Sequence, residues 1–363
     1  MNRRGSSAIA LNETASSSTG AHAFVTIRPI EECRSAWREL TDHSPRASLY
    51  HSFEWQRVLN RAYGLKFHVA LLDNAGRLAA GALFAPASRP FSSRLIALPF
   101  SDYCPPLSVD GALAEKTLLR ELVANSRSIG HFEIHGVSAS APWQIVDCFA
   151  HWTLDLQRPF AAIEKSMDRN FKRQTRRATE SGVTVETGSS EAHAKRFYLL
   201  HLETRRRLGL PAPPWRFFRL VQEIFSERDR FEVYLAAADG KDVAAAVLLK
   251  DGSRLHCKWS ARCANPPLGA THLLFSQFCE QYAGSFGTLD LGRTDVRNQG
   301  LNRFKRELGA VSNPLPYAFY PAASSLVSSE HTGGVAGIVS NVWRNLPMPI
   351  ARVIGGAAYK YLS

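Results

Sequence analysis

Two charged side chains in the last third of the chain are placed where they could reach a reacting group. The segment Gly300–Gly309 has the spacing of a short helix that stops at a glycine, and Lys305 lies at the edge of its apolar face, next to Phe304. The Lys305 ammonium group can lean into a cleft or extend over the helix surface. Asp290 lies within an apolar strand pattern, where its carboxylate can accept a proton from an amine or pair with Arg293.

Two turns supply further candidates. In the first, Asp102 can serve as a base or an amine-binding group if an acceptor lies between two domains, or it can cap the turn. Tyr103 can line an acceptor pocket, or pack beside Pro105 and Pro106. The second turn precedes a predicted helix, whose first backbone N–H groups can hold an anion. These N–H groups belong to Gly269, Ala270 and Thr271.

The formal net charge of +12 is concentrated in a few segments, above all in a predicted helix around residues 165–177. The cations of this helix, which include Lys172, Arg173 and Arg176, lie roughly opposite its apolar stripe. Such a face is either solvated or binds phosphate groups, as in tRNA, in a nucleotide-linked donor or acceptor, or in anionic lipid.

Composition excludes several classes of protein. No apolar run approaches the ~18 residues of a membrane span. Residues 1–22 lack the apolar core of a signal peptide and are predicted to be a disordered tail. The six cysteines include no CxxC pair, which favours reduced thiols in a cytosolic protein and argues against a metal site.

A repeat at a spacing of 164 residues organises the predicted elements. Phe67–Phe84 aligns with Phe231–Leu248, and six of the 18 aligned positions are identical. Each copy predicts a β-hairpin, preceded by a helix and followed by a strand, a Pro-Pro pair and another helix. The fold class is therefore predicted to be α+β, with two duplicated domains that each have a central, mainly antiparallel sheet flanked by helices. We expect these domains at 23–157 and 158–322.

The last segment, 323–363, is predicted to be a linker followed by a basic helical tail. Its two short amphipathic patterns, which contain Trp343 and Tyr361, suit either a membrane interface or docking against a domain.

Four segments, read in order, resemble the FemAB-like branch of the GNAT-fold transferases. They are Asn170–Val185, Phe197–Gly209, the second hairpin continued through His256–Leu274, and Leu289–Thr294 followed by Gly300–Ala310. The first half is similar to the N-terminal domain of that family mainly through Pro99–Pro106. The family has two tandem GNAT domains. It includes enzymes that move an amino acid from aminoacyl-tRNA onto an amine of a peptidoglycan precursor, and members from exopolysaccharide and exosortase gene clusters.

The resemblance implies acyl transfer to an amine, with Phe304 and Lys305 at the reacting centre and the lysine stabilising the developing negative charge. It also implies that the first domain binds the acceptor and the second is catalytic. The turn before Gly269 departs from a coenzyme A loop, because Pro266 and Pro267 lack N–H donors. This departure favours aminoacyl-tRNA as the donor but leaves acyl-CoA open.

We therefore expect an N-acyl or aminoacyl transferase that acts on a UDP- or lipid-linked precursor of peptidoglycan or a polysaccharide. One alternative is an acyl-CoA-dependent GNAT N-acetyltransferase for an amino sugar or lipid-linked intermediate. Another is a non-catalytic RNA- or membrane-binding protein on the same fold. We expect no tightly bound cofactor, and a monomer in the cytoplasm or, through the tail, on the cytoplasmic face of the inner membrane.

Overall fold

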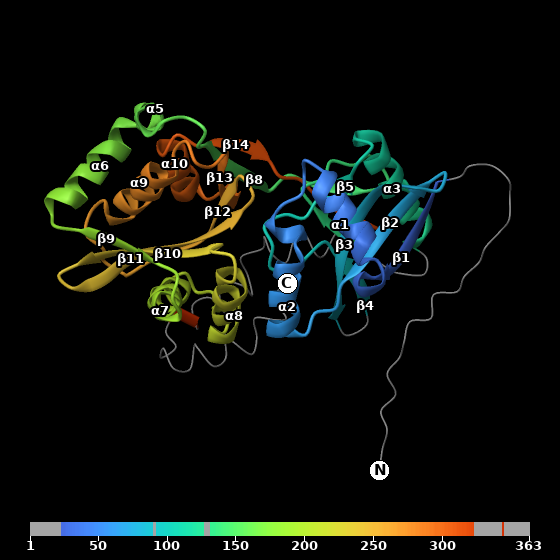
Figure 1. Ribbon diagram of the computed structural model, residues 1–363, viewed down its shortest axis with the longest axis horizontal. Coiled ribbons are helices and arrows are strands. Elements are labelled where there is room, and N and C mark those ends of the chain that lie inside the picture. Colours follow the sequence, from blue (N-terminus) through green and yellow to red (C-terminus); the bar gives the residue numbers. More distant parts are fainter. Residues whose placement is uncertain (1–22, 90–91, 127–130, 323–342, 345–363) are drawn as a thin grey trace, which may run out of the picture.

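A computed structural model of the chain describes residues 23–89, 92–126, 131–322 and 343–344. These residues form two β-sheets, side by side, each with helices packed against it (Figure 1). The predicted α+β class with two mainly antiparallel sheets is confirmed. The expected tail 1–22 lies outside the described residues, as does the segment 323–363 apart from residues 343–344.

The first sheet belongs largely to the first half of the chain. Its strands are β1 (Phe24–Pro29), β2 (His68–Asn74), β3 (Arg77–Arg89), β4 (Ser92–Ile96), β5 (Leu107–Ser108), β6 (His131–His135), β7 (Gln144–Val146) and β15 (Tyr317–Tyr320). They lie in the order β1-β2-β3-β4-β6-β15-β7, with β5 beside β3. Among the described strand pairs of this sheet, only β4 and β6 run parallel. The accompanying helices are η1 (Ile30–Glu32), α1 (Arg34–His43), η2 (Leu49–His51), α2 (Phe53–Tyr63) and α3 (Ala112–Ala124).

The second sheet has the same plan. Its strands are β8 (Phe149–Asp155), β9 (Thr184–Gly188), β10 (Phe231–Ala238), β11 (Lys241–Asp251), β12 (Arg254–Arg262), β13 (Thr288–Asp295) and β14 (Val311–Pro314). They lie in the order β14-β8-β13-β12-β11-β10-β9, and β12 and β13 are its parallel pair. Its helices are α5 (Phe160–Ser166), α6 (Arg169–Glu180), α7 (Glu191–Arg207), α8 (Trp215–Ser226), α9 (Ala270–Tyr282) and α10 (Gln299–Glu307).

The two repeated hairpins pair their strands in the same register. Val69 pairs with Leu83 in the first copy, and the residues 164 positions later, Val233 and Val247, pair in the second. The register shifts after Leu72 in the first hairpin and after Ala236 in the second, which is again the same position of the repeat. Each copy also continues through a helix, α3 or α9, into the parallel pair of its sheet. The duplication inferred from sequence is therefore structural.

Two strands cross the expected domain division. β8 falls within 23–157 but pairs with β13 of the second sheet. β15 falls within 158–322 but lies between β6 and β7 of the first sheet. Each crossing strand is an internal strand of the sheet that it joins, because β8 lies between β13 and β14 just as β15 lies between β6 and β7. The assignment of separate functions to the two halves stays a prediction.

An apolar contact joins the halves. The helices α5, α6, α9 and α10 cover one face of the second sheet, while α7 and α8 cover the other face, and α8 also meets α2 (Figure 1). The indole ring of Trp55 from α2 lies 6.1 Å from the ring of Phe217 and 6.2 Å from that of Trp259. These rings belong to one buried core that continues from the first half into the second. The two halves are therefore held in a defined orientation by burial of aromatic surface.

The start of α9 depends on a glycine. Gly269 has φ +85°, and a Cβ there would overlap the backbone carbonyl oxygen of Gln174 in α6. We expect Gly269→Ala to lower the free energy of unfolding by about 2–4 kcal/mol, through backbone strain and displacement of α6. The control is Gly252→Ala, which shares a positive φ of +56° but meets no atom within 4 Å. Urea unfolding should show a smaller loss, about 1 kcal/mol, for the control; equal losses would refute the close approach of α6 and α9.

Candidate functional site

A cavity of about 1040 Å³, called the cleft below, opens beside α9, α10 and the strands β12 and β13, and a loop of the first half reaches it. Its volume suits a sizeable ligand. The cleft brings together seven residues that the sequence singled out: Lys305, Phe304, Arg293, Asp102, Gly269, Ala270 and Thr271. Five others do not line it: Asp290, Tyr103, Lys172, Arg173 and Arg176.

Lys305 is the buried cation of the cleft. Its side chain comes from α10, and the residue is 5% exposed. The ammonium Nζ donates to the carbonyl oxygen of Leu291 at 2.7 Å, to that of Gly292 at 3.3 Å, and to Thr294 Oγ1 at 2.7 Å. Burial lowers the pKa of Lys305 from 10.5 to about 8, although nearby Asp102 counteracts part of the effect. The group is thus charged at neutral pH and close to losing its proton.

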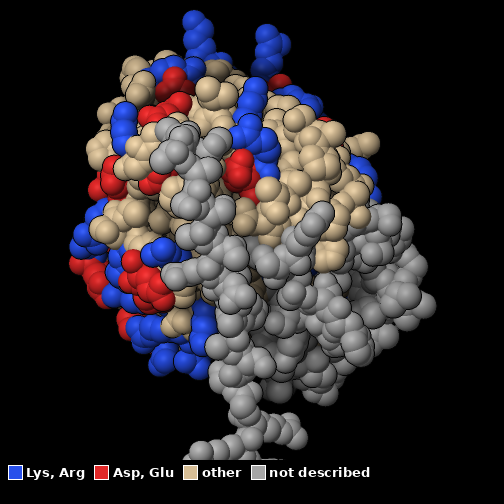
Figure 2. Space-filling model, turned by 90° about the vertical axis from the view of Figure 1, so that its right-hand side faces the viewer, with Lys and Arg blue, Asp and Glu red and all other residues tan. Residues whose placement is uncertain are grey.

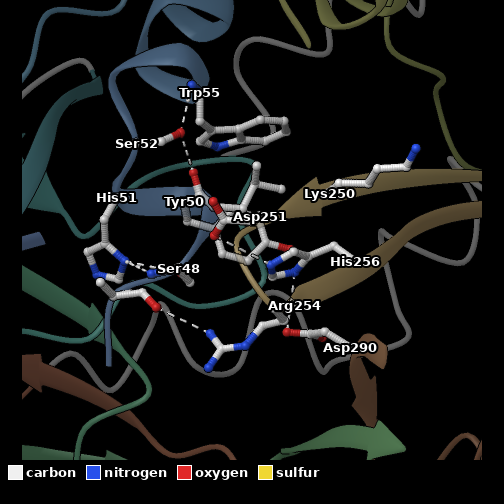
Figure 3. Close-up of polar contacts among 12 residues, drawn as sticks. Ser48, Tyr50, His51, Ser52, Trp55, Lys250, Asp251, Arg254, His256 and Asp290 are labelled. Carbon is white, nitrogen blue, oxygen red and sulfur yellow. Dashed lines mark hydrogen bonds and ion pairs between the residues drawn. The ribbon is translucent and has the colours of Figure 1, made fainter. Parts of the chain in front are cut away.

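Asp290 lies behind the wall of the cleft and is 1% exposed. Oδ1 accepts hydrogen bonds from His151 Nε2 at 2.9 Å and from the backbone N–H of Gly292 at 2.8 Å, and Oδ2 accepts one from the Tyr103 hydroxyl at 2.6 Å. Figure 3 shows His256 beside Asp290, with Nδ1 at 3.3 Å from Oδ2. Burial acts to raise the pKa of Asp290, but His256 and the hydrogen bond from His151 hold it well below its usual value.

Asp102 brings a carboxylate of the first half into the cleft. Oδ1 accepts from Lys258 Nζ at 3.0 Å, and Oδ2 accepts from the Tyr50 hydroxyl at 2.9 Å. Burial raises the pKa of Asp102, but the charges of Lys258 and Arg293 outweigh this effect and lower it overall. Asp102 is therefore an anion at neutral pH and forms a buried ion pair with Lys258.

Lys258 is held by aromatic rings as well as by Asp102. Its Nζ lies 4.7 Å from the ring centroid of Tyr50 and 5.7 Å from those of Trp55 and Trp259. Burial lowers the pKa of Lys258 despite the nearby carboxylate. The ion pair therefore rests on the same aromatic contact that joins the two halves.

The lining of the cleft is cationic. Among the described residues that line it, the acidic side chain is that of Asp102, and the cations are Arg207, Lys258, Arg262, Arg293 and Lys305. Arg293 is exposed; its guanidinium lies 4.6 Å from the ring centroid of Phe149 and donates to the Tyr317 hydroxyl. Even with one ion pair subtracted, this wall attracts an anionic ligand.

The first turn of α9 forms another side of the cleft. Gly269 is the N-cap residue, so the N–H groups that follow it begin a helix of 13 residues. Next to this turn, the ring of Phe304 packs 5.2 Å from His272 and 5.0 Å from Phe275. Burial lowers the pKa of His272, which keeps its imidazole neutral. This part of the cleft is therefore apolar around Phe304 and electropositive at the start of α9.

Lys172, Arg173 and Arg176 lie on α6, outside the cleft. Their helix is nevertheless adjacent to it, because Gln174 lines the cleft. Among the described residues, neither Lys172 nor Arg176 has an ion-pair partner, and Arg173 donates to the Asn170 side chain. By contrast, the face of the molecule in Figure 2 shows Lys and Arg mixed with Asp and Glu. Lys172, Arg173 and Arg176 therefore add positive charge to α6, the helix next to the cleft.

Sequence reasoning missed Lys258, Arg207 and His272 as residues of the cleft. Lys258 had a detectable signal, because a lysine in the middle of an apolar strand must find a partner when the strand is buried. His272 had none, since a histidine early in a helix is compatible with many surroundings.

The described residues contain neither a membrane-spanning helix nor a metal-binding cluster. No helix among them is long and apolar enough to cross a membrane. No group of three or more His, Cys, Asp or Glu side chains within this part of the chain could hold a metal ion.

The lowered pKa of Lys305 predicts a pH dependence of stability. Between pH 8 and 10 the folded protein has largely lost this proton while the unfolded chain retains it, so the unfolded state binds more protons and stability rises with pH. Relative to Lys305→Met, we expect the free energy of unfolding of the wild type to rise by about 2 kcal/mol across this range. Chemical denaturation of both proteins at several pH values measures it, and parallel pH profiles would contradict it.

The comparisons with known proteins identify the domain that contains most of the cleft. A profile of the acetyltransferase (GNAT) domain family matches residues 165–306, which contain α6, α9, α10 and most of the cleft. No curated protein matches this sequence.

Solved structures share the fold at low identity. FemX is 12% identical, with 84% of this chain and 99% of FemX covered and a TM-score of 0.59. A tandem GNAT protein from the clavulanic acid biosynthesis pathway is 12% identical, with coverages of 83% and 100% and a TM-score of 0.51. The C-terminal domain (DUF2156) of a putative lysylphosphatidylglycerol synthetase from Agrobacterium fabrum is 14% identical, with coverages of 85% and 96% and a TM-score of 0.51. Residues 165–306 therefore form a GNAT domain, and the chain is an acyltransferase built on the tandem GNAT fold.

Proposed function

We propose that this enzyme transfers an aminoacyl group from aminoacyl-tRNA to an amine of a cell-envelope precursor, and that the reaction takes place beside Lys305. The observation that carries the proposal is a buried ammonium group on the wall of a cationic cleft, next to the start of α9. In acyl transfer the carbonyl oxygen becomes an oxyanion, which a fixed positive charge stabilises more strongly than it stabilises the ground state.

The reaction balances without a cofactor. The acceptor amine attacks the acyl carbonyl carbon, a C–N bond forms, the ester C–O bond breaks, and the amine proton ends on the leaving hydroxyl. The three N–H groups of Lys305 are already used within the protein. The bond to the Gly292 carbonyl is the longest, at 3.3 Å, and is the one that a substrate oxyanion would displace.

The donor assignment rests on charge and on the α9 turn. A tRNA presents many phosphates, and the cations of α6, the helix next to the cleft, add positive charge to those that line it. Pro266 and Pro267, which lack N–H donors, line the cleft just before Gly269.

The second candidate donor is acyl-CoA. It is favoured by the first turn of α9, whose residues line the cleft; apart from the N–H of Ala270, which donates to the Pro267 carbonyl, the N–H groups of this turn suit a pyrophosphate. With this donor a C–S bond breaks in place of the C–O bond.

The acceptor assignment uses Asp102. Its carboxylate comes from the first half, faces the cleft and is anionic, so it suits an acceptor ammonium group before that group loses its proton. Peptidoglycan and polysaccharide precursors, linked to UDP or to a lipid, carry such amines together with phosphate groups.

Lys305→Met should abolish transfer while leaving donor binding intact. We expect kcat to fall about 100-fold or more, because the lost charge acts on the transition state. The control is Lys241→Met, which removes an exposed lysine from the start of β11. Near-normal kcat in Lys305→Met would exclude this site.

The donor is tested by thermal shift with acetyl-CoA, aminoacyl-tRNA and a UDP-linked muramyl peptide. We expect aminoacyl-tRNA to stabilise the protein, and Arg173→Ala/Arg176→Ala to weaken that shift and reduce its dependence on salt. Arg38→Ala/Arg120→Ala, in the first half, is the charge-matched control. A strong shift with acetyl-CoA alone would replace the leading donor with the second candidate.

A further inference from the structure

Asp290 closes an irregular turn in the wall of the cleft. The β13–β8 register shifts between Asp290 and Arg293, and Gly292 adopts φ +68° within this bulge. The Asp290 carboxylate accepts the N–H of Gly292 at 2.8 Å, two residues along the chain. A buried carboxylate that bonds to the backbone in this way fixes the conformation of the bulge.

The same bulge provides hydrogen-bond acceptors for Lys305. Its two carbonyl groups, from Leu291 and Gly292, accept hydrogen bonds from the ammonium, and Thr294 just beyond it supplies the third acceptor. The carboxylate and the ammonium therefore hold the same short stretch of backbone from opposite sides. A change in the contacts of Asp290 must move the acceptors of Lys305.

Two adjacent residues of the first half clasp this bulge. Tyr103 reaches Asp290 Oδ2 behind the cleft, and Asp102 lies on the cleft side. A Cβ on Gly292 would come within 2.5 Å of Asp102 Oδ2, so the approach of the two halves requires glycine there. His151 of β8 donates to Asp290 Oδ1 at 2.9 Å, and His256 of β12 lies with Nδ1 3.3 Å from Oδ2.

We propose that Tyr103 of the first half is a positioning residue that, through Asp290, holds the Leu291–Gly292 bulge and thereby orients the Lys305 ammonium group. Docking of the two halves then sets the geometry of the reacting cation. The catalytic meaning of this arrangement rests on the proposed function, but the geometric coupling does not. In this arrangement Asp290 and Tyr103 support Lys305 and do not contact the substrate themselves.

The test measures the reactivity of Lys305, so it needs no substrate. The protein is treated with acetic anhydride, and the acetylation rate of each lysine is followed by mass spectrometry. Tyr103→Phe removes the hydroxyl but keeps the ring, which packs 4.7 Å from His151. The lost hydrogen bond makes the Leu291–Gly292 bulge more mobile, so the ammonium of Lys305 is held less firmly. We therefore expect Lys305 to react about 3- to 10-fold faster, relative to exposed Lys241 in the same sample.

The matched control is Tyr234→Phe. Tyr234 is a buried residue of β10 whose hydroxyl makes a 2.6 Å bond to Gln281, and β10 lies three strands away from β13 in the sheet. Its loss should leave the rate of Lys305 unchanged. Equal rates for Tyr103→Phe and Tyr234→Phe would overturn the proposal.

Asp290 variants supply a rescue test. Asp290→Asn retains an acceptor for the N–H of Gly292, whereas Asp290→Ala does not, so Lys305 should stay more protected in the former. If either variant fails to fold, Tyr103→Phe alone decides. In a transfer assay, Tyr103→Phe should lower kcat with little change in KM. Activity of Lys305→Met would refute the proposed function, while the labelling result would still decide whether Tyr103 positions the lysine.

Discussion

The buried carboxylate of Asp290 is the constraint around which the two halves meet. An anion removed from water must be surrounded by hydrogen-bond donors, or its burial costs several kcal/mol. Tyr103 comes from the first half, His151 from the crossing strand β8, and the N–H of Gly292 from the strand of Asp290 itself. Because these donors come from separate segments, the carboxylate is satisfied only when both sheets are assembled and docked.

The duplication explains why such a site lies at the junction. Both copies retain the hairpin with its register shift and the parallel strand pair, which are the parts that build a sheet. Only the second half contributes the lysine that follows Phe304, whereas the first half contributes Asp102 and Tyr103 from a loop. Trp55, which contacts Phe217 and Trp259, also donates from Nε1 to Ser101 Oγ of this loop at 2.8 Å.

The sequence predicted the architecture well, because hairpin periodicity and a long repeat are local signals. It also predicted that Lys305, Asp102 and the start of α9 would be candidate site residues, and the structure places all of them at one cleft. The partners of Asp290 could not be predicted, since Tyr103 is 187 residues away and the bulge that turns the strand at Gly292 depends on docking. The pairing of β8 and β15 with the sheet of the other half could not be predicted either, because the pattern of a strand does not specify which sheet the strand joins.

The return of β15 to the first sheet has a consequence for how the chain folds. Among the described strands, β7 is attached to its sheet through β15 alone, and β15 comes after the entire second sheet in the chain. During synthesis the first sheet therefore stays incomplete, and the edge of β6 stays unpaired, until residue 320 has left the ribosome. Non-local pairing of this kind slows folding and leaves an exposed edge that can aggregate. The two halves are thus duplicated units in sequence, but the first sheet is complete only after the second half has been synthesised.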